Sequence, residues 1–155
     1  MAGAGPTVCA GKNPAKEDTK ELNIRVLESL FGPQRIAMDA LPPDHIRLLH
    51  IEAGVDQSPI CCKLVTTNLL EASPPYEALS YTWGSTEQDS PITCDDVPMF
   101  VTQNLYDAIQ YLRNPVHERI MWIDAVCINQ RHDPERTEQV GIMKDIYAKA
   151  SRVVI

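Results

Sequence analysis

Residues 76–84 read YEALSYTWG, and residues 119–128 read RIMWIDAVCI. Both stretches have the apolar composition of strands that lie inside a sheet. Because successive side chains of a strand point to opposite faces, the first stretch divides into two sets: Tyr76, Ala78 and Ser80 on one face, and Glu77, Leu79 and Tyr81 on the other. Neither face is strongly polar, so we expect this first strand to be covered by other elements on both faces.

Two β-hairpins are predicted around these strands. Residues 46–51 (IRLLHI) and 59–65 (PICCKLV) are short apolar runs, and the turn-rich segment EAGVDQS separates them. Residues 90–101 (SPITCDDVPMFV) form the second pattern, with the turn at Asp95-Asp96.

Two helices are predicted from caps and apolar stripes. The first begins after Thr102, a good N-cap residue, ends before Asn114-Pro115, and buries a stripe formed by Leu105, Ala108/Ile109 and Leu112. The second begins with Asp133 as N-cap and Pro134 as first helical residue, and buries a stripe formed by Val140, Met143, Ile146/Tyr147 and Ala150.

The order of these elements predicts the fold class. From Tyr76 the chain reads strand, hairpin, helix, strand, helix, and then the start of a further buried strand at Arg152. This alternation is typical of an α/β fold whose parallel strands are joined by right-handed crossovers.

The chain has 155 residues, enough for one ordinary domain. Residues 1–20 are rich in Gly, Ala and Lys, as disordered tails are, and residues 21–31 have the pattern of a short amphipathic helix. We therefore predict a disordered tail plus a short helix over residues 1–40, and a folded domain over residues 41–155.

The charge of the chain argues against two classes of partner. Fourteen basic and twenty-one acidic residues give a net charge of −7, all of it in residues 41–155. Because an acidic domain repels phosphate groups, we expect no nucleic-acid partner and no binding to anionic membrane surfaces. No apolar run is long enough to span a membrane, and the first twenty residues lack the pattern of a secretory signal.

The five cysteines are predicted to be reduced thiols of a cytoplasmic protein. Their number is odd, none forms C-x-x-C, and no His pair has zinc-ligand spacing, so we expect no metal. Cys127 and His132 lack an orienting third group and an oxyanion site, which argues against a nucleophile. The chain has neither a dinucleotide-binding glycine motif nor a phosphate-binding loop, so no cofactor is evident.

Several motifs in this order resemble the fungal heterokaryon incompatibility (HET) domain. That family reads Y-x-A-L-S-Y-x-W-G, then N-L-x-x-A-L-x-x-L-R, then W-I-D-A-x-C-I-N-Q followed by E-R-x-x-Q-V-x-x-M-x-x-I-Y. The chain matches these motifs at residues 76–84, 104–113, 122–130 and 135–147, and residues 46–49 (IRLL) resemble a common lead-in. The resemblance covers roughly residues 41–155.

The resemblance implies a role in fungal non-self recognition, where HET domains are effectors that trigger growth arrest or programmed cell death. The family is also distantly similar to Toll/interleukin-receptor (TIR) domains. This likeness implies a flavodoxin-like parallel sheet with flanking helices and added hairpins. Some TIR domains cleave NAD, and others signal through self-association, so the resemblance implies protein partners and leaves enzymatic activity open.

Six residues are candidates for ligand contact because ligands bind beyond the carboxyl ends of parallel strands. An indole can stack on a base, a carboxylate can accept hydrogen bonds from ribose hydroxyls, amides can read polar edges, and a guanidinium can hold a phosphate. The candidates are Trp83, Gly84, Asp124, Asn129, Gln130 and Arg136.

Each candidate also has an ordinary structural role. Trp83 can be a core anchor, Asp124 can hold loop amides, and Asn129 can set a turn. Arg136 can pair with a neighbouring acid, and acids such as Glu135 suit the first turn of a helix. The sequence alone leaves both interpretations open.

Cleavage of NAD needs a carboxylate near the ribose, by analogy with sugar hydrolysis. In TIR enzymes the resemblance places this glutamate on a helix after the strand in which the present sequence stops. We therefore assign no catalytic residue, and NAD is a possible substrate by analogy only. The third alternative is a C-terminally truncated product, regulatory or non-functional, that pairs with relatives through an exposed sheet edge.

Overall fold

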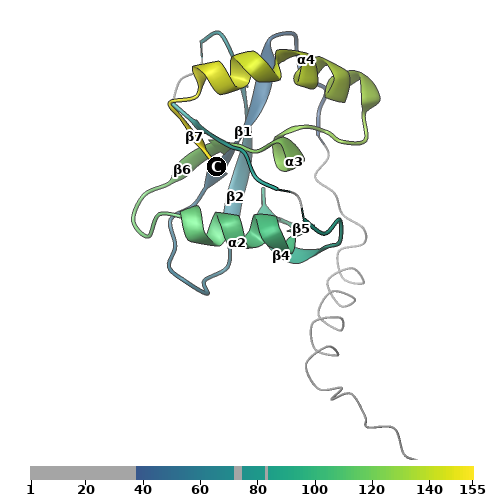
Figure 1. Ribbon diagram of the computed structural model, residues 1–155. Coiled ribbons are helices and arrows are strands. Elements are labelled where there is room, and N and C mark those ends of the chain that lie inside the picture. Colours follow the sequence, from purple (N-terminus) through teal and green to yellow (C-terminus); the bar gives the residue numbers. More distant parts are fainter. Residues whose placement is uncertain (1–37, 72–74, 83) are drawn as a thin grey trace, which may run out of the picture. The chain divides into compact units, whose positions relative to one another are not determined.

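A computed structural model describes residues 38–71, 75–82 and 84–155. Within them the chain forms a mixed seven-stranded sheet with helices, an α/β arrangement, in the strand order β5-β4-β2-β1-β6-β3-β7 (Figure 1). The tail and short helix predicted for residues 1–40 fall almost entirely outside the described residues and stay a prediction.

Both predicted hairpins are confirmed. Strands β1 (His45–Ile51) and β2 (Cys61–Asn68) pair antiparallel over seven residue pairs. Strands β4 (Gln88–Cys94) and β5 (Val97–Thr102) pair antiparallel across Asp95 and Asp96, whose φ angles are 51° and 63°. Two consecutive residues with positive φ are typical of a type I′ turn, whose twist matches that of the strands it joins.

The flavodoxin-like parallel sheet expected from the resemblance is not what the structure shows. Parallel pairing joins β3 (Glu77–Leu79) to β6 (Arg119–Trp122) and to β7 (Arg152–Val154), and also joins β2 to β4 over two residue pairs. However, β1 pairs antiparallel with both β2 and β6. The hairpins predicted as additions therefore form much of the sheet itself, and the sheet is mostly antiparallel.

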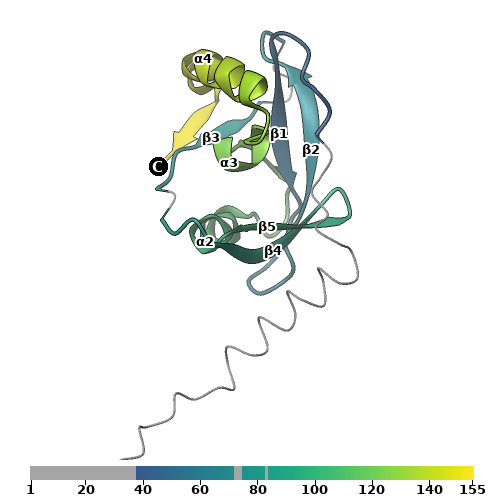
Figure 2. The ribbon, with the colours of Figure 1, turned by 90° about the vertical axis from the view of Figure 1, so that its right-hand side faces the viewer.

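Two helices cover β3 and its neighbours. Helix α4 (Asp133–Lys149) leads from β6 towards β7, and α2 (Gln103–Leu112) precedes β6. Figure 2 shows α4 and α2 on opposite sides of β3. The hydroxyl of Tyr76 donates to Ile146 O on α4 at 2.6 Å, whereas Glu77 binds Arg119, which donates to Leu112 O on α2 at 2.5 Å. The predicted alternation of the two faces is thus confirmed.

The long apolar strand predicted over RIMWIDAVCI is wrong in its second half. Strand β6 ends at Trp122, and a one-turn helix α3 (Asp124–Cys127) follows. The N–H groups of Val126 and Cys127 donate to Ile123 O at 3.0 and 2.7 Å, which turns the chain at once. The segment is apolar because this turn is buried, and a short apolar run does not distinguish a strand from a buried helical turn.

The helix predictions are confirmed in part. Thr102 caps α2 and accepts a hydrogen bond from Leu105 N at 3.3 Å. The N-cap of α4 is His132 and not Asp133: His132 Nδ1 accepts from Glu135 N at 3.2 Å, which places Asp133 and Pro134 inside the helix. Val140, predicted in the buried stripe, is 54% exposed.

The core lies between the sheet and these helices. Its largest members are completely or almost completely buried, and they come from every layer: Ile46, Leu48, Leu49 and Ile51 of β1, Tyr76 before β3, Leu105 and Ile109 of α2, Met121 and Trp122 of β6, and Ile146 of α4. Strand β7, predicted to be buried, is at the edge of the described sheet, and Arg152 and Val153 on it are exposed.

Candidate functional site

The carboxyl ends of β3 and β6 lie side by side, as the site prediction required. Ala78 of β3 is in register with Trp122 of β6 in a parallel pair. Ser80 and Tyr81 follow β3, and Asp124 follows β6 after a single residue. We call Ser80, Tyr81, Asp124, Gln130 and Tyr147 the carboxyl-end cluster.

Asp124 begins helix α3 and is half-buried. Its Oδ1 atom accepts a hydrogen bond from Ala125 N at 2.7 Å, which fixes the carboxylate at the start of the turn. The side-chain amide of Gln130 donates to the backbone oxygen of Asp124 at 2.9 Å. The structure therefore brings Asp124 and Gln130 together; whether they contact a ligand stays a prediction.

The Asp124 carboxylate acts electrostatically on two tyrosines, Tyr81 and Tyr147. Burial, with a smaller contribution from the Asp124 carboxylate, raises the pKa of Tyr81 to about 12, and a hydrogen bond with Thr102 opposes this. Burial and Asp124 also raise the pKa of Tyr147, on α4. The Tyr147 ring packs edge-on against Trp122, with centroids 5.5 Å apart, and its hydroxyl lies 3.4 Å from Leu79 O. Both phenols are therefore neutral hydrogen-bond donors at physiological pH.

Gly84 has a structural reason to be glycine. Its φ is +63°, a conformation that other residues rarely adopt. A Cβ atom at this position would be 2.1 Å from Asn104 Nδ2 in the first turn of α2, and that nitrogen lies 3.4 Å from Thr82 O. Gly84 thus lets the segment after β3 approach α2 closely. Trp83 lies outside the described residues, so its predicted role is untested.

Asn129 and Arg136 are engaged in local structure. Asn129 Oδ1 accepts from Arg131 N at 3.2 Å, a turn contact, and Asn129 N donates to Glu135 Oε1 at 2.9 Å. Arg136 is half-exposed on the first turn of α4 and pairs with Asp133 at 3.0 Å. These contacts match the ordinary roles that the sequence left open for both residues, and ligand contact by either stays a prediction.

Among the residues that the structure describes, the most deeply buried ion pair was missed by sequence reasoning. Arg47 on β1 and Glu135 on α4 form two hydrogen bonds, of 2.5 and 3.1 Å, and their side chains are 4% and 5% exposed. Arg47 also donates to Cys127 O at 3.2 Å and to Asp39 O at 2.6 Å. Burial acts to raise the pKa of Glu135, but the hydrogen bonds from Arg47 and from Asn129 N lower it overall. The pair therefore ties β1, α4 and the segment after β6 together.

A signal for this role exists in the helix spacing. Glu135 and Gln139 are four residues apart, on the same helix face as Ile142, Met143 and Ile146. Gln139 is 2% exposed, and its amide donates to His45 O at 3.0 Å. Two polar residues at helical spacing in line with an apolar stripe thus indicate buried polar contacts, not only the favourable dipole effect predicted for Glu135.

The described cysteines are free thiols, and three of them are buried. Cys62 and Cys94 are direct partners on the parallel strands β2 and β4, and their mutual hydrogen bond and burial raise the pKa of Cys62 far above its ordinary value. Burial raises the pKa of Cys127 to about 12, which argues further against a nucleophile. In residues 38–71, 75–82 and 84–155, no group of three or more His, Cys, Asp or Glu side chains is arranged to hold a metal ion.

Within the described part of the chain, none of the helices combines the length and the apolar character needed to cross a membrane.

Comparison with known proteins identifies the family. The family described as "Heterokaryon incompatibility protein (HET)" matches residues 76–155, just over half of the chain. The chain is 31% identical over 158 residues to Heterokaryon incompatibility protein 6, OR allele, of Neurospora crassa. This alignment covers 92% of the chain but 22% of the relative, so the chain spans about a fifth of the length of that protein. No solved structure matches the chain. The chain therefore belongs to the heterokaryon incompatibility (HET) family.

Proposed function

We propose that this chain is an effector of fungal non-self recognition that signals growth arrest or programmed cell death when incompatible cells fuse. The observation that carries the proposal is its 31% identity to Heterokaryon incompatibility protein 6 over nearly its whole length. Because the chain spans about a fifth of that relative, the activity of the whole protein comes to this chain only as part of the proposal. The effector acts in the cytoplasm through protein partners, including copies of itself.

The carboxyl-end cluster is the proposed functional surface. Asp124 supplies a carboxylate acceptor, Tyr81 supplies a neutral phenol, and Gln130 braces the segment that holds Asp124. The Tyr147 hydroxyl donates to Leu79 O and offers its oxygen as a further acceptor. A surface of this kind suits a ligand or partner loop that carries both hydroxyl and carbonyl groups. Trp83 and Gly84 border it in sequence and belong to the proposed surface.

An NAD-cleaving activity of TIR type is the second candidate. It is supported by the parallel unit β6-β3-β7, which carries Asp124 beyond a carboxyl end, and by the ability of Asp124 to accept hydrogen bonds from ribose hydroxyls. The family description and the relative's name give this candidate no further support. Incubating the folded chain with NAD and measuring free nicotinamide tests it: release above the buffer control supports the activity, and no release argues against it.

The effector proposal is tested by inducible expression of the chain in a fungal host, with colony growth and viability staining of the cells as readouts. We expect growth arrest or death with the wild-type chain. Glu135→Ala, which removes the partner of a buried arginine, is the destabilised control and should reduce the growth arrest in step with its loss of stability. If the wild-type chain accumulates to the level of a harmless control protein and growth is unchanged, the proposal is wrong.

A further inference from the structure

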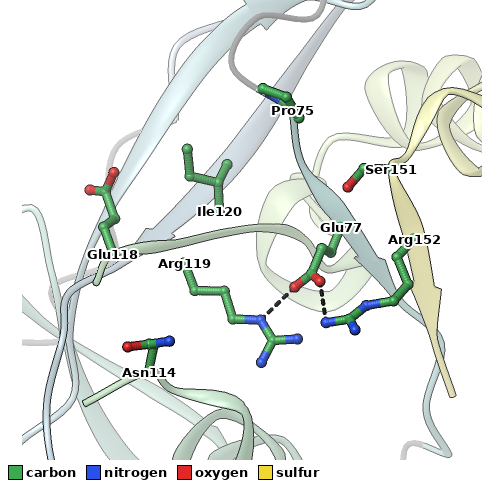
Figure 3. A pocket seen from close by; sticks show the side chains of 8 residues that line it. All are labelled: Pro75, Glu77, Asn114, Glu118, Arg119, Ile120, Ser151 and Arg152. Atoms are coloured by element: carbon green, nitrogen blue, oxygen red, sulfur yellow. Dashed lines mark hydrogen bonds and ion pairs between the residues drawn. The ribbon is translucent and has the colours of Figure 1, made fainter. Parts of the chain in front are cut away.

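At the opposite, amino ends of β3, β6 and β7, a pocket of about 430 Å³ opens between the two helices' connections to the sheet. Figure 3 shows its lining, which includes Glu77, Asn114, Arg119, Ser151 and Arg152. This volume is within the range of ~300–1,000 Å³ that is usual for small-molecule sites. Glu77 and Arg119 are the first residues of β3 and β6, whereas the carboxyl-end cluster follows the last residues of these strands. The pocket and the cluster therefore lie at opposite ends of the strands.

The charges in this pocket do not balance locally. Glu77 binds both guanidinium groups: its Oε2 atom lies 2.5 Å from Arg119 Nε, and its Oε1 atom pairs with Arg152 Nη2. Two cations therefore share one carboxylate. In Figure 3 both guanidinium groups lie on the same side of Glu77 and leave further N–H donors directed away from it.

Two further side chains of the lining, Asn114 and Glu118, determine which hydrogen-bonding groups lie near the guanidinium groups. Asn114 Oδ1 accepts hydrogen bonds from Val116 N and His117 N, at 2.8 and 2.9 Å, so its amide nitrogen is on the side of Arg119 (Figure 3). The other acid of the lining, Glu118, points away from the guanidinium groups and lies 3.2 Å from His50 Nδ1. In Figure 3 the Arg119 guanidinium lies between the Asn114 amide and the Arg152 guanidinium, and Glu77 is the carboxylate beside them.

We propose that this pocket binds a small organic anion, whose carboxylate or phosphate group is held by the guanidinium groups of Arg119 and Arg152 and by the amide of Asn114. Arginine forks suit the geometry of both oxyanions. Ile120 and Pro75 also line the pocket, but Figure 3 shows their side chains on the side of Glu118, away from the guanidinium groups. Such a site is unexpected in a chain with a net charge of −7, since the overall field repels anions.

A purely structural role is the competing explanation. Glu77 links β6 and β7 through β3, and Arg119 Nη1 caps the end of α2 by donating to Leu112 O. Under that explanation, substitutions in the cluster change the stability of the fold and leave anion binding unaffected. The experiment must therefore read out binding and stability separately.

The test is a titration of the full chain at low ionic strength with sodium phosphate, and separately with sodium acetate, followed by amide and arginine Nε NMR signals. We expect saturable shifts centred on Arg119 and Arg152. Saturation by phosphate alone identifies a phosphate group as the ligand chemistry, and saturation by acetate identifies a carboxylate. Saturation by neither anion at tens of millimolar overturns the proposal.

Three variants sharpen this result. Arg152 is 63% exposed, so Arg152→Ala should fold normally and weaken binding about tenfold. Glu77→Gln removes the competing carboxylate and should tighten binding. Arg131→Ala is the matched control, because Arg131 is an exposed arginine that does not line the pocket, and this variant should bind like the wild type. Equal affinity of the wild-type, Arg152→Ala and Glu77→Gln chains overturns the proposal.

Discussion

Two clusters of arginine and carboxylate side chains lie at the two ends of the parallel strands, and they differ in burial. We call the pair Arg47–Glu135 the sealed cluster, and Glu77 with Arg119 and Arg152 the open cluster. At the carboxyl end, Arg47 and Glu135 are sealed in the interior with side chains 4% and 5% exposed. At the amino end, Glu77 and Arg119 are 18% and 19% exposed, and Arg152 is 63% exposed. A buried pair has no freedom to exchange its partner, whereas an open one has donors left for a ligand. The sealed cluster is therefore structural, and the open one can also bind.

The largest expected effect is on the sealed cluster. Glu135→Ala leaves the Arg47 guanidinium buried without a counter-charge and should lower the free energy of unfolding by about 3–5 kcal/mol. Glu138→Ala, at an exposed position on the same helix, is the control and should have little effect. Urea denaturation followed by tryptophan fluorescence measures both. A loss for Glu135→Ala no greater than for the control would contradict the structural role of the pair.

Gly84→Ala should cause the next largest loss in the free energy of unfolding. Gly84 follows β3, so this substitution perturbs the carboxyl end of the strands. The new Cβ atom meets Asn104, and the positive φ disfavours alanine, so we expect a loss of about 1–3 kcal/mol. Gly141→Ala is the matched control, since nothing lies within 4 Å of a Cβ atom there. It should instead stabilise the helix slightly. Equal stability of the two variants would show that the segment after β3 does not approach α2 as described.

Lowering the pH should reduce the free energy of unfolding through both clusters. The pKa of Glu135 and that of Glu77 are lowered: burial opposes this at each site, but the arginine hydrogen bonds outweigh it. A lowered folded-state pKa stabilises the fold at pH values above the unfolded-state pKa, near 4.5, and this stability is lost as pH falls through the folded-state value. Unfolding free energies measured between pH 7 and pH 3 should fall, and Glu135→Gln should reduce this dependence. An unchanged slope in that variant would contradict the assignment.

The smallest effect is expected for the open cluster. Arg152→Ala removes a largely exposed ion pair and should change the free energy of unfolding by only ~0–1 kcal/mol, because solvent screens such pairs. Its anion affinity should change much more, as described above. If thermal unfolding shows a loss comparable to that of Glu135→Ala, the two clusters do not differ in the way proposed.

Local features of the fold were predictable because their causes are local. The turn at Asp95-Asp96 and the cap at Thr102 depend on neighbouring residues, and both are confirmed. The antiparallel pairing of β1 with β6 depends on residues about seventy positions apart, and no local pattern reveals it. The one-turn helix at Asp124 was taken for a strand, since its apolarity reflects burial and not conformation.

The candidate site was predictable in part for the same reason. Strand order placed Asp124 and Gln130 at one edge, and the structure brings them together. The tyrosines that flank Asp124 come from distant segments and were not singled out. The pairing of Arg47 with Glu135 joins positions 88 residues apart, so the sequence offered only the shared helix face of Glu135 and Gln139.

Asp124→Asn tests the central claim most directly, because it removes the charge and keeps an oxygen that can accept from Ala125 N. Asp124 is half-buried and hydrogen-bonded, so we expect the variant to fold with a loss of about 1 kcal/mol in the free energy of unfolding. The pKa of Tyr81 should fall below its value of about 12, which verifies the local electrostatics. In the fungal host the variant should no longer arrest growth. Full growth arrest by a stable Asp124→Asn chain would contradict the claim that the carboxyl-end cluster is the functional surface.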